Sequence, residues 1–171
     1  FLARTLGDVA RVPVKTFVET EPDRWRDAAT LAPVAAADLA RAAQGARLVV
    51  LGGDPERARR YAGSAALLVW PAARGQPGDW YVERPPASPL AAALVGIAWD
   101  SLPPAASVGD APRDSGAVTV LTARLARRGM ARPVVTLEQR DGRRRALVTA
   151  AGLWRWAFRG GAGEEAYRAL V

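Results

Sequence analysis

The first half of the chain alternates between helix-like and strand-like patterns of apolar residues. Apolar positions three or four apart predict helices, and short aliphatic runs predict buried strands. The predicted helices cover residues 1–9, 34–43 and 55–62, and the predicted strands cover residues 12–18, 47–51 and 64–70. This alternation is typical of a parallel sheet covered by helices.

The second half is dominated by strand patterns. The predicted strands cover residues 118–125, 133–139 and 146–148, and a last helix covers residues 163–171. Asp141-Gly142 lies between two of these strands. An Asp-Gly pair between apolar runs is a strong signal for a tight turn, so we expect a β-hairpin there.

Three stretches show no regular pattern and are predicted to be irregular: residues 19–33, 71–89 and 105–116. A long loop in a compact domain is often functional. Trp80 and Tyr81 lie in the second stretch, and aromatic residues in loops often anchor interfaces. We therefore expect these two residues to contact a partner.

The clearest local pattern is RRRALVTAAGLWRWAF, residues 143–158, which reads as a strand, a glycine turn and an aromatic segment. If this segment stays extended, Trp154 and Trp156 share one face and Arg155 points the other way. The tryptophans could then line a ligand pocket, with Arg155 holding an anion. Core packing is the alternative, and it is favoured because large aromatic side chains dominate cores.

Gly52-Gly53-Asp54 follows a predicted strand and precedes Pro55. A glycine-rich turn from strand to helix can hold a phosphate group. The spacing matches neither the dinucleotide-binding nor the P-loop motif. The pattern favours a simpler interpretation, in which Asp54 caps a helix that has Pro55 in its first turn.

The amino-acid composition limits which catalytic and metal-binding groups the chain can have. The 171 residues fit one domain, and they include neither cysteine nor histidine. A thiolate nucleophile, a disulfide, a Cys-ligated metal and the commonest general base are therefore excluded. We expect no enzymatic activity, no cofactor and no metal. The carboxylates of Asp54, Asp79, Glu83 and Asp100 leave open a hydrolase with an unconventional catalytic group, but their spacing matches no motif.

The net charge is +7, and every basic residue except Lys15 is arginine. Such charge attracts nucleic acids or anionic lipids. The sequence lacks the aromatic-interleaved basic groove of a single-strand binder, so we expect no nucleic-acid partner. No apolar run approaches the roughly 20 residues that a membrane-spanning helix needs.

Three segments together resemble one family: FLARTLGDVARVPVKTFV, WDSLPPA, and RRALVTAAGLWRWAF followed by EEAYRALV. They are similar to the glutamine amidotransferase-like domain of large bacterial membrane proteins, which often carry von Willebrand factor A-type domains. The resemblance implies an α/β, flavodoxin-like three-layer sandwich with a mostly parallel central sheet and a β-hairpin near the C-terminus. Active members of this superfamily need a cysteine, here expected after residues 67–70, and a histidine, here expected near residues 152–156; both are missing.

Together these observations predict one domain over residues 1–171, excised from a larger chain because both ends fall inside predicted helices. The expected function is that of a catalytically inactive interaction module of a membrane-anchored bacterial protein, in the cell envelope and outside the cytoplasm. Its partners would be other domains of the same chain or a neighbouring envelope protein, with membrane contact only through segments outside this chain. The alternative is a small-molecule or anion-binding domain that uses a pocket at the strand C-termini. The candidate binding residues are Gly52, Gly53, Asp54, Trp80, Tyr81, Trp154, Arg155 and Trp156.

Overall fold

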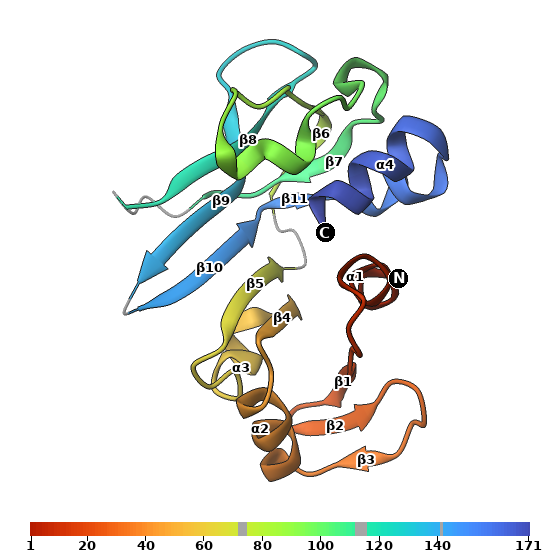
Figure 1. Ribbon diagram of the computed structural model, residues 1–171, viewed down its shortest axis with the longest axis vertical. Helices are drawn as coiled ribbons and strands as arrows, with labels where there is room; N and C mark the ends of the chain where they lie inside the picture. The colour runs from red at the N-terminus through yellow and green to blue at the C-terminus, as the bar shows by residue number, and fades with distance from the viewer. Residues whose placement is uncertain (72–74, 112–115, 141) are drawn as a thin grey trace.

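The computed structural model describes residues 1–71, 75–111, 116–140 and 142–171. The described residues form an α/β structure with a mixed eight-stranded sheet and a separate three-stranded antiparallel sheet (Figure 1). The elements in chain order are α1 (Leu2–Ala10), β1 (Phe17–Glu21), β2 (Arg24–Asp27), β3 (Pro33–Val34), α2 (Ala36–Gln44), β4 (Leu48–Gly53), α3 (Pro55–Arg59), β5 (Ala66–Pro71), β6 (Gln76–Val82), the 3₁₀ helices η1 (Pro89–Leu94) and η2 (Trp99–Ser101), β7 (Ala105–Val108), β8 (Val118–Leu125), β9 (Arg132–Arg140), β10 (Arg143–Val148), β11 (Ala150–Ala151), the 3₁₀ helix η3 (Leu153–Phe158) and α4 (Gly161–Leu170).

The prediction of a mostly parallel, flavodoxin-like sheet is wrong. The large sheet has the order β11-β7-β6-β8-β9-β10-β5-β4. Within the described ranges, parallel pairing joins β10 to β5 and β5 to β4, whereas the other neighbours pair antiparallel. The parallel part is therefore confined to one end of a sheet that is antiparallel elsewhere.

The error comes from two stretches predicted to be loops. Residues 71–89 contain β6 and residues 105–116 contain β7, while residues 72–74 and 112–115 lie outside the described part of the chain. β6 pairs antiparallel with both β7 and β8, with a shift in register between Pro77 and Trp80. Pro77 and Gly78 interrupt the alternation of this strand, which hid it from pattern analysis.

The predicted hairpin is present. β9 and β10 pair antiparallel from Arg140↔Arg143 to Val135↔Val148. Asp141 of the expected turn lies outside the described residues. The hairpin links the antiparallel strands to the parallel end, because β10 also pairs with β5. Residues 118–125, predicted as a strand, form β8 with the same bounds.

The three-stranded sheet was not predicted. Its strands fall mainly in residues 19–33, which are so charged that the sequence indicated a loop, and the strand expected over residues 12–18 begins only at Phe17. Trp25 meets the edge of the Tyr61 ring with centroids 5.8 Å apart, and Asp23 pairs with Arg60. These contacts connect the small sheet to the segment that follows α3.

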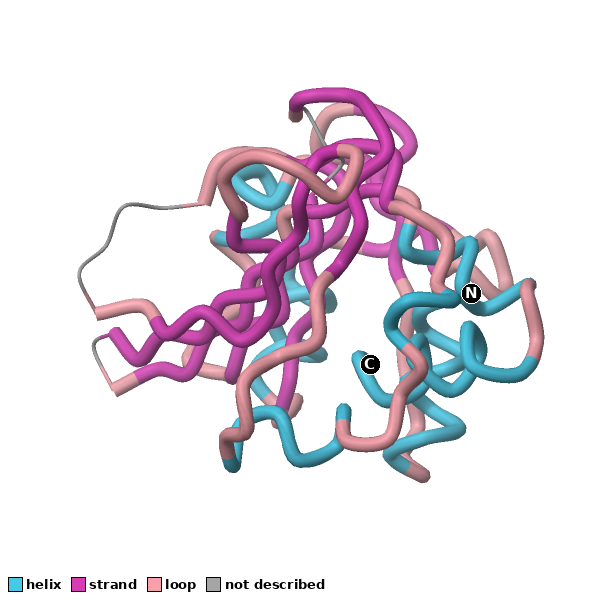
Figure 2. The backbone as a smooth tube through the Cα atoms, turned by 90° about the horizontal axis from the view of Figure 1, so that it is seen from above, coloured by secondary structure: helices cyan, strands magenta, loops and turns pink. Residues whose placement is uncertain are grey.

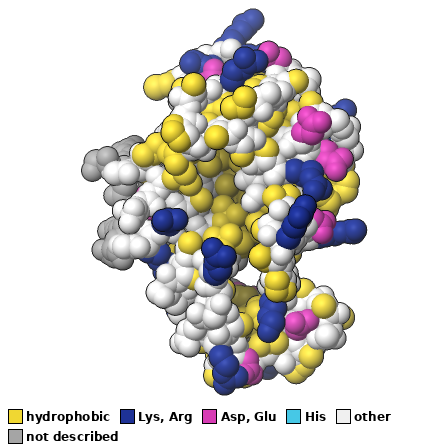
Figure 3. Space-filling model, in the orientation of Figure 1, with side chains coloured by type: hydrophobic (Ala, Val, Ile, Leu, Met, Phe, Trp, Pro, Cys, Tyr) yellow, Lys and Arg dark blue, Asp and Glu magenta, His cyan; other side chains and the backbone are white. Residues whose placement is uncertain are grey.

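The main core lies between the large sheet and the helices η1, η3 and α4. Its largest fully buried side chains are Trp156, Leu121, Leu153, Val108 and Val134. A smaller core forms beside α3 from Leu51, Ala62, Leu67, Val69 and Leu147. From above, most helical turns lie to one side of the strands (Figure 2). Figure 3 shows hydrophobic side chains gathered in a hollow between the two ends of the molecule.

Trp156 offers a test of this core. Its side chain is 0% exposed, and its Nε1 donates a hydrogen bond to the carbonyl of Pro103 at 2.7 Å. Truncation of a buried tryptophan costs about 3–5 kcal/mol. We expect Trp156→Ala to lower the free energy of unfolding by about this amount in chemical denaturation, whereas Trp154→Ala should change it by less than about 1 kcal/mol. Equal effects of the two substitutions would contradict the assigned core.

Candidate functional site

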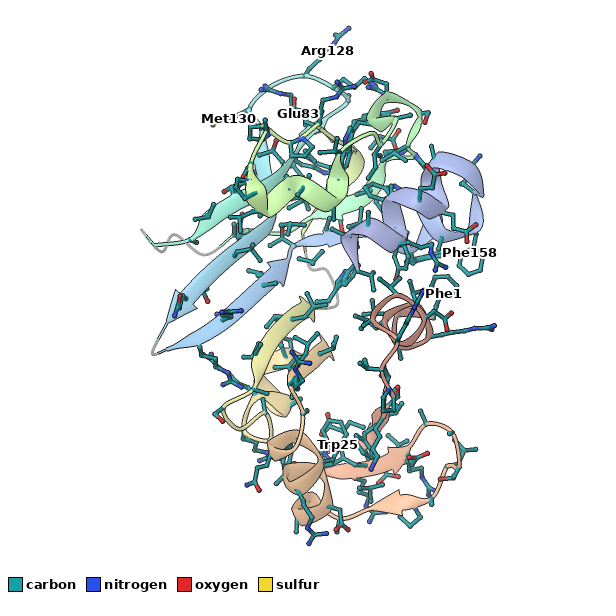
Figure 4. The ribbon with its side chains drawn as sticks, viewed as in Figure 1. Phe1, Trp25, Glu83, Arg128, Met130 and Phe158 are labelled. Atoms are coloured by element: carbon teal, nitrogen blue, oxygen red, sulfur yellow. The ribbon has the colours of Figure 1, made fainter. Side chains whose placement is uncertain are left out.

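Three aromatic side chains form a continuous cluster on the surface, which we call the aromatic patch: Phe1, Trp154 and Phe158. Their exposed fractions are 58%, 54% and 67%. The ring centroids of Phe1 and Phe158 are 4.9 Å apart, and those of Trp154 and Phe158 are 5.9 Å apart. Figure 4 shows Phe1 and Phe158 next to one another between α1 and the C-terminal helical segment. Residues distant in sequence therefore build one apolar surface.

The conformation of η3 explains which rings face outward. In a 3₁₀ helix, side chains three residues apart lie on the same side. Leu153 and Trp156 have this spacing and are 1% and 0% exposed, which leaves Trp154 and Phe158 on the surface. The sequence prediction assumed an extended segment, in which both tryptophans would share a face. The structure separates them into one core residue and one surface residue.

Gly152 makes this turn possible. Its φ is +84°, a left-handed conformation that other residues rarely adopt. A Cβ atom here would lie 3.1 Å from both the backbone nitrogen and the Cβ of Ala106. The glycine thus lets the chain turn from β11 into η3 directly against β7, and this turn sets where Trp154 emerges.

Arg155 does not lie between the two tryptophans, because Trp154 is at the surface and Trp156 is in the core. Its guanidinium lies 5.8 Å from the centroid of the Trp154 ring, within reach of a cation–π interaction. Trp156 faces the core, where it meets Trp99 edge-on with centroids 6.4 Å apart. Of the three residues predicted here, Trp154 and Arg155 are brought together at the surface and Trp156 supports them from below.

Trp80 and Tyr81 lie in β6 and not in a loop. Trp80 is 2% exposed, and its Nε1 donates to the carbonyl of Gln76 at 2.9 Å. Burial removes Trp80 from the surface available to a partner. Tyr81 lines a pocket of about 250 Å³, and the guanidinium of Arg127 lies 4.2 Å from the centroid of the Tyr81 ring.

The same pocket contains two of the carboxylates considered for hydrolysis. Glu83 accepts hydrogen bonds from Arg124 Nε at 2.7 Å and from Thr122 Oγ1 at 2.9 Å. Asp100 lies 3.4 Å from Arg127, and its side chain is 95% exposed. Each carboxylate is therefore matched by an arginine, and the pair is not the buried, water-containing acid pair that the hydrolase alternative requires.

Gly52-Gly53-Asp54 lies where β4 ends and α3 begins. Asp54 occupies the position before the helix and Pro55 the first turn, as the capping interpretation predicts, but the Asp54 side chain makes no capping hydrogen bond. α3 spans five residues, so it has little aligned dipole to attract an anion. The structure does not bring these three residues together with Trp80, Tyr81 or the aromatic patch in any described contact.

A second pocket was missed by sequence analysis. It measures about 630 Å³ and lies at the N-terminal ends of β5 and β10, whereas the sequence predicted one at the strand C-termini. It is lined by Arg59, Gly63, Ser64, Leu67, Glu138, Gly142, Arg143 and Arg145. The basic run of residues 143–145 in a strand opposite Glu138 was the available signal, since cross-strand neighbours share a face.

Comparison of the chain with protein-family models, with curated proteins and with solved structures finds no match. Over the described ranges, no three acidic side chains gather as a metal site would require. No helix in the same ranges combines the length and apolarity needed to cross a membrane.

Tyr167 of α4 supports the aromatic patch from beneath, with its ring centroid 5.5 Å from that of Phe1. Burial raises the pKa of Tyr167 above its usual value near 10. The folded state therefore favours the neutral phenol, so its contribution to stability is complete below about pH 10 and is lost as the pH rises through the folded-state pKa.

We expect Tyr167→Phe to lose less stability than the wild type as the pH rises above about 10, because phenylalanine has no proton to release. Denaturation midpoints measured across this range provide the test. Parallel pH profiles for the two proteins would show that ionisation of Tyr167 is not linked to folding.

Proposed function

We propose that this chain is a catalytically inactive protein-interaction module of a larger, membrane-anchored bacterial protein, and that the aromatic patch is its binding surface. The observation that carries the proposal is the contact of Phe158 with both Phe1 and Trp154, since all three rings are more than half exposed. Isolated exposed hydrophobic residues are normal on protein surfaces, but contiguous apolar patches mark interaction sites.

The chemistry of the patch suits a protein partner. Tryptophan and phenylalanine bury large areas on binding and lose few side-chain rotamers, and tryptophan is among the residues enriched at binding hot spots. Trp154 and Phe158 project from one short helix whose opposite side is fixed in the core, so the rings are held in place before a partner arrives. Preorganisation of this kind reduces the entropic cost of association.

Charge favours an acidic partner. The chain carries a net charge of +7, and exposed Arg155 and Arg159 adjoin the patch residues in η3 and at its end. Peripheral charges of this kind speed encounter with a surface of opposite sign and contribute to specificity. The proposed partner thus presents an apolar centre with carboxylates around it.

The cell-envelope setting rests on the resemblance to glutamine amidotransferase-like domains, which stays a prediction. The three sequence segments support it, although the mixed sheet differs from the fold that the resemblance implies. The missing cysteine and histidine support the absence of amidotransferase chemistry. The proposed partner is accordingly another domain of the same protein or a neighbouring envelope protein.

The test compares three immobilised forms of the chain for binding to solubilised envelope proteins of its source bacterium: wild type, the double variant Trp154→Ser/Phe158→Ser, and Met130→Ser. Met130 is 87% exposed and lies away from Phe1 and Phe158, so it controls for the loss of a surface apolar side chain (Figure 4). Loss of hot-spot contacts worth about 2 kcal/mol lowers affinity about thirtyfold.

We expect at least one envelope protein to bind the wild type and Met130→Ser equally. The immobilised double variant should bind the same protein with about thirtyfold lower affinity. Circular dichroism confirms that all three forms are folded. If every bound protein is retained equally by the three forms, the aromatic patch is not the binding surface.

A further inference from the structure

The strand β4 forms one edge of the large sheet, and we call its unpaired side the open edge. β4 pairs with β5, and no strand within the described ranges pairs with its other side. Natural sheets protect their edges with short strands, charged side chains, proline or bulges. The opposite edge strand, β11, spans two residues, whereas β4 spans six, contains no charged residue or proline, and pairs without a break in register. The open edge therefore lacks the usual protections.

The backbone of β4 presents unpaired hydrogen-bonding groups along this edge. Over the described ranges, no hydrogen bond joins its backbone to any element other than β5. An edge strand presents a row of free N–H and C=O groups. The partner whose own groups repeat at the same spacing is another extended polypeptide, which pairs with such an edge by adding a strand.

The two faces of the sheet at this end differ in their coverage. One face packs against α3 and carries the smaller core. On the other face, Leu48 and Val50 of β4 lie beside Ala66 and Leu68 of β5. Leu48 is 44% exposed and the other three residues are partly exposed. Strands that pair parallel are normally covered on both faces, so apolar side chains at the open edge still have surface to bury.

A hollow lies beside the open edge. In Figure 1, residues 11–16, between α1 and β1, lie across a gap from β4, and Figure 3 shows hydrophobic side chains in the hollow at this place. Val12 and Val14 of this segment are 48% and 41% exposed. A single added strand would lie between β4 and residues 11–16, with apolar side chains available on both sides of it.

We propose that the open edge of β4 binds one extended, uncharged and apolar segment of a partner polypeptide, which adds to the large sheet as a further strand. Main-chain hydrogen bonds to the edge supply affinity, and contacts of alternate side chains with Leu48 and Val50 supply specificity. The uncharged sequence of β4 selects an uncharged segment, because a charge buried without a partner is costly. The site is centred on β4 and does not rest on the aromatic patch.

Two other occupants fit the observations less well. A lipid chain or another apolar small molecule would cover the exposed side chains but leave the N–H and C=O groups of the edge unpaired. A second copy of the chain pairing through its own β4 would bring a whole sheet toward the place where residues 11–16 lie (Figure 1). A single strand meets both the backbone and the space.

The experiment titrates the folded chain with the capped synthetic peptide KVLVVVE, whose charged ends keep it soluble. The control peptide has the same sequence but carries N-methyl groups on two consecutive central residues. Because adjacent residues of a strand direct their N–H groups to opposite edges, these methyl groups block pairing along both edges while the side chains stay the same. Calorimetry measures affinity, and hydrogen–deuterium exchange shows where the peptide binds.

Two variants of the chain test the position of the site. Leu48→Glu places a carboxylate at the open edge. Val118→Glu is the matched control, because Val118 is 51% exposed and is also the first residue of a strand in the same sheet, four strands away from β4. Circular dichroism checks the fold of each form, and sedimentation equilibrium measures its mass.

We expect the unmodified peptide to bind saturably to the wild type and to Val118→Glu with the same affinity, and to slow amide exchange in residues 48–53. Leu48→Glu should weaken binding about tenfold or more, because its carboxylate would be buried beside an apolar strand. The N-methylated peptide should not bind.

Absence of saturable binding, equal binding of the two peptides, or equal weakening by the two substitutions would overturn the proposal. A wild-type dimer that Leu48→Glu converts to a monomer would also overturn it, because the occupant would then be a second copy. These variants leave Phe1, Trp154 and Phe158 unchanged, so a negative result here would not bear on the aromatic patch.

Discussion

The burial of Trp156 is the interaction on which the rest of the site depends. Its ring lies in the main core, and its Nε1 donates a hydrogen bond to the carbonyl of Pro103, which follows η2. Because η3 has about three residues per turn, placing Trp156 and Leu153 inward directs Trp154 and Phe158 outward. Gly163 contributes by bringing α4 close, since a Cβ there would lie 2.8 Å from the carbonyl oxygen of Trp156. The aromatic patch is therefore a consequence of core packing.

The sequence revealed elements whose patterns are local. It identified the hairpin of β9 and β10, the strand β8, and the helices α1, α2 and α4 within a few residues. It missed β6 and β7, because Pro77 and Gly78 mask the alternation of the first and the second is only four residues long. Strand order depends on pairing between distant segments, and single-sequence periodicity carries no information about it.

Only part of the candidate site could be predicted from the sequence, because contacts between distant segments leave no local pattern. Trp154 and Arg155 were identified because they stand out in sequence, but Phe1 and Phe158 are far apart in the chain and their contact has no local signal. The pocket at the N-terminal ends of β5 and β10 likewise requires these two strands to pair, which places residues some eighty positions apart side by side.

The most direct test of the central claim places a photoreactive benzoyl-phenylalanine at position 154 of the full-length protein in its own cells. The same group at position 130, which is also strongly exposed, serves as the reference. The account predicts that irradiation links position 154 to one specific envelope protein or to one other domain of the same chain, and that position 130 gives no such product. Equal products from both positions, or none from position 154, would contradict it.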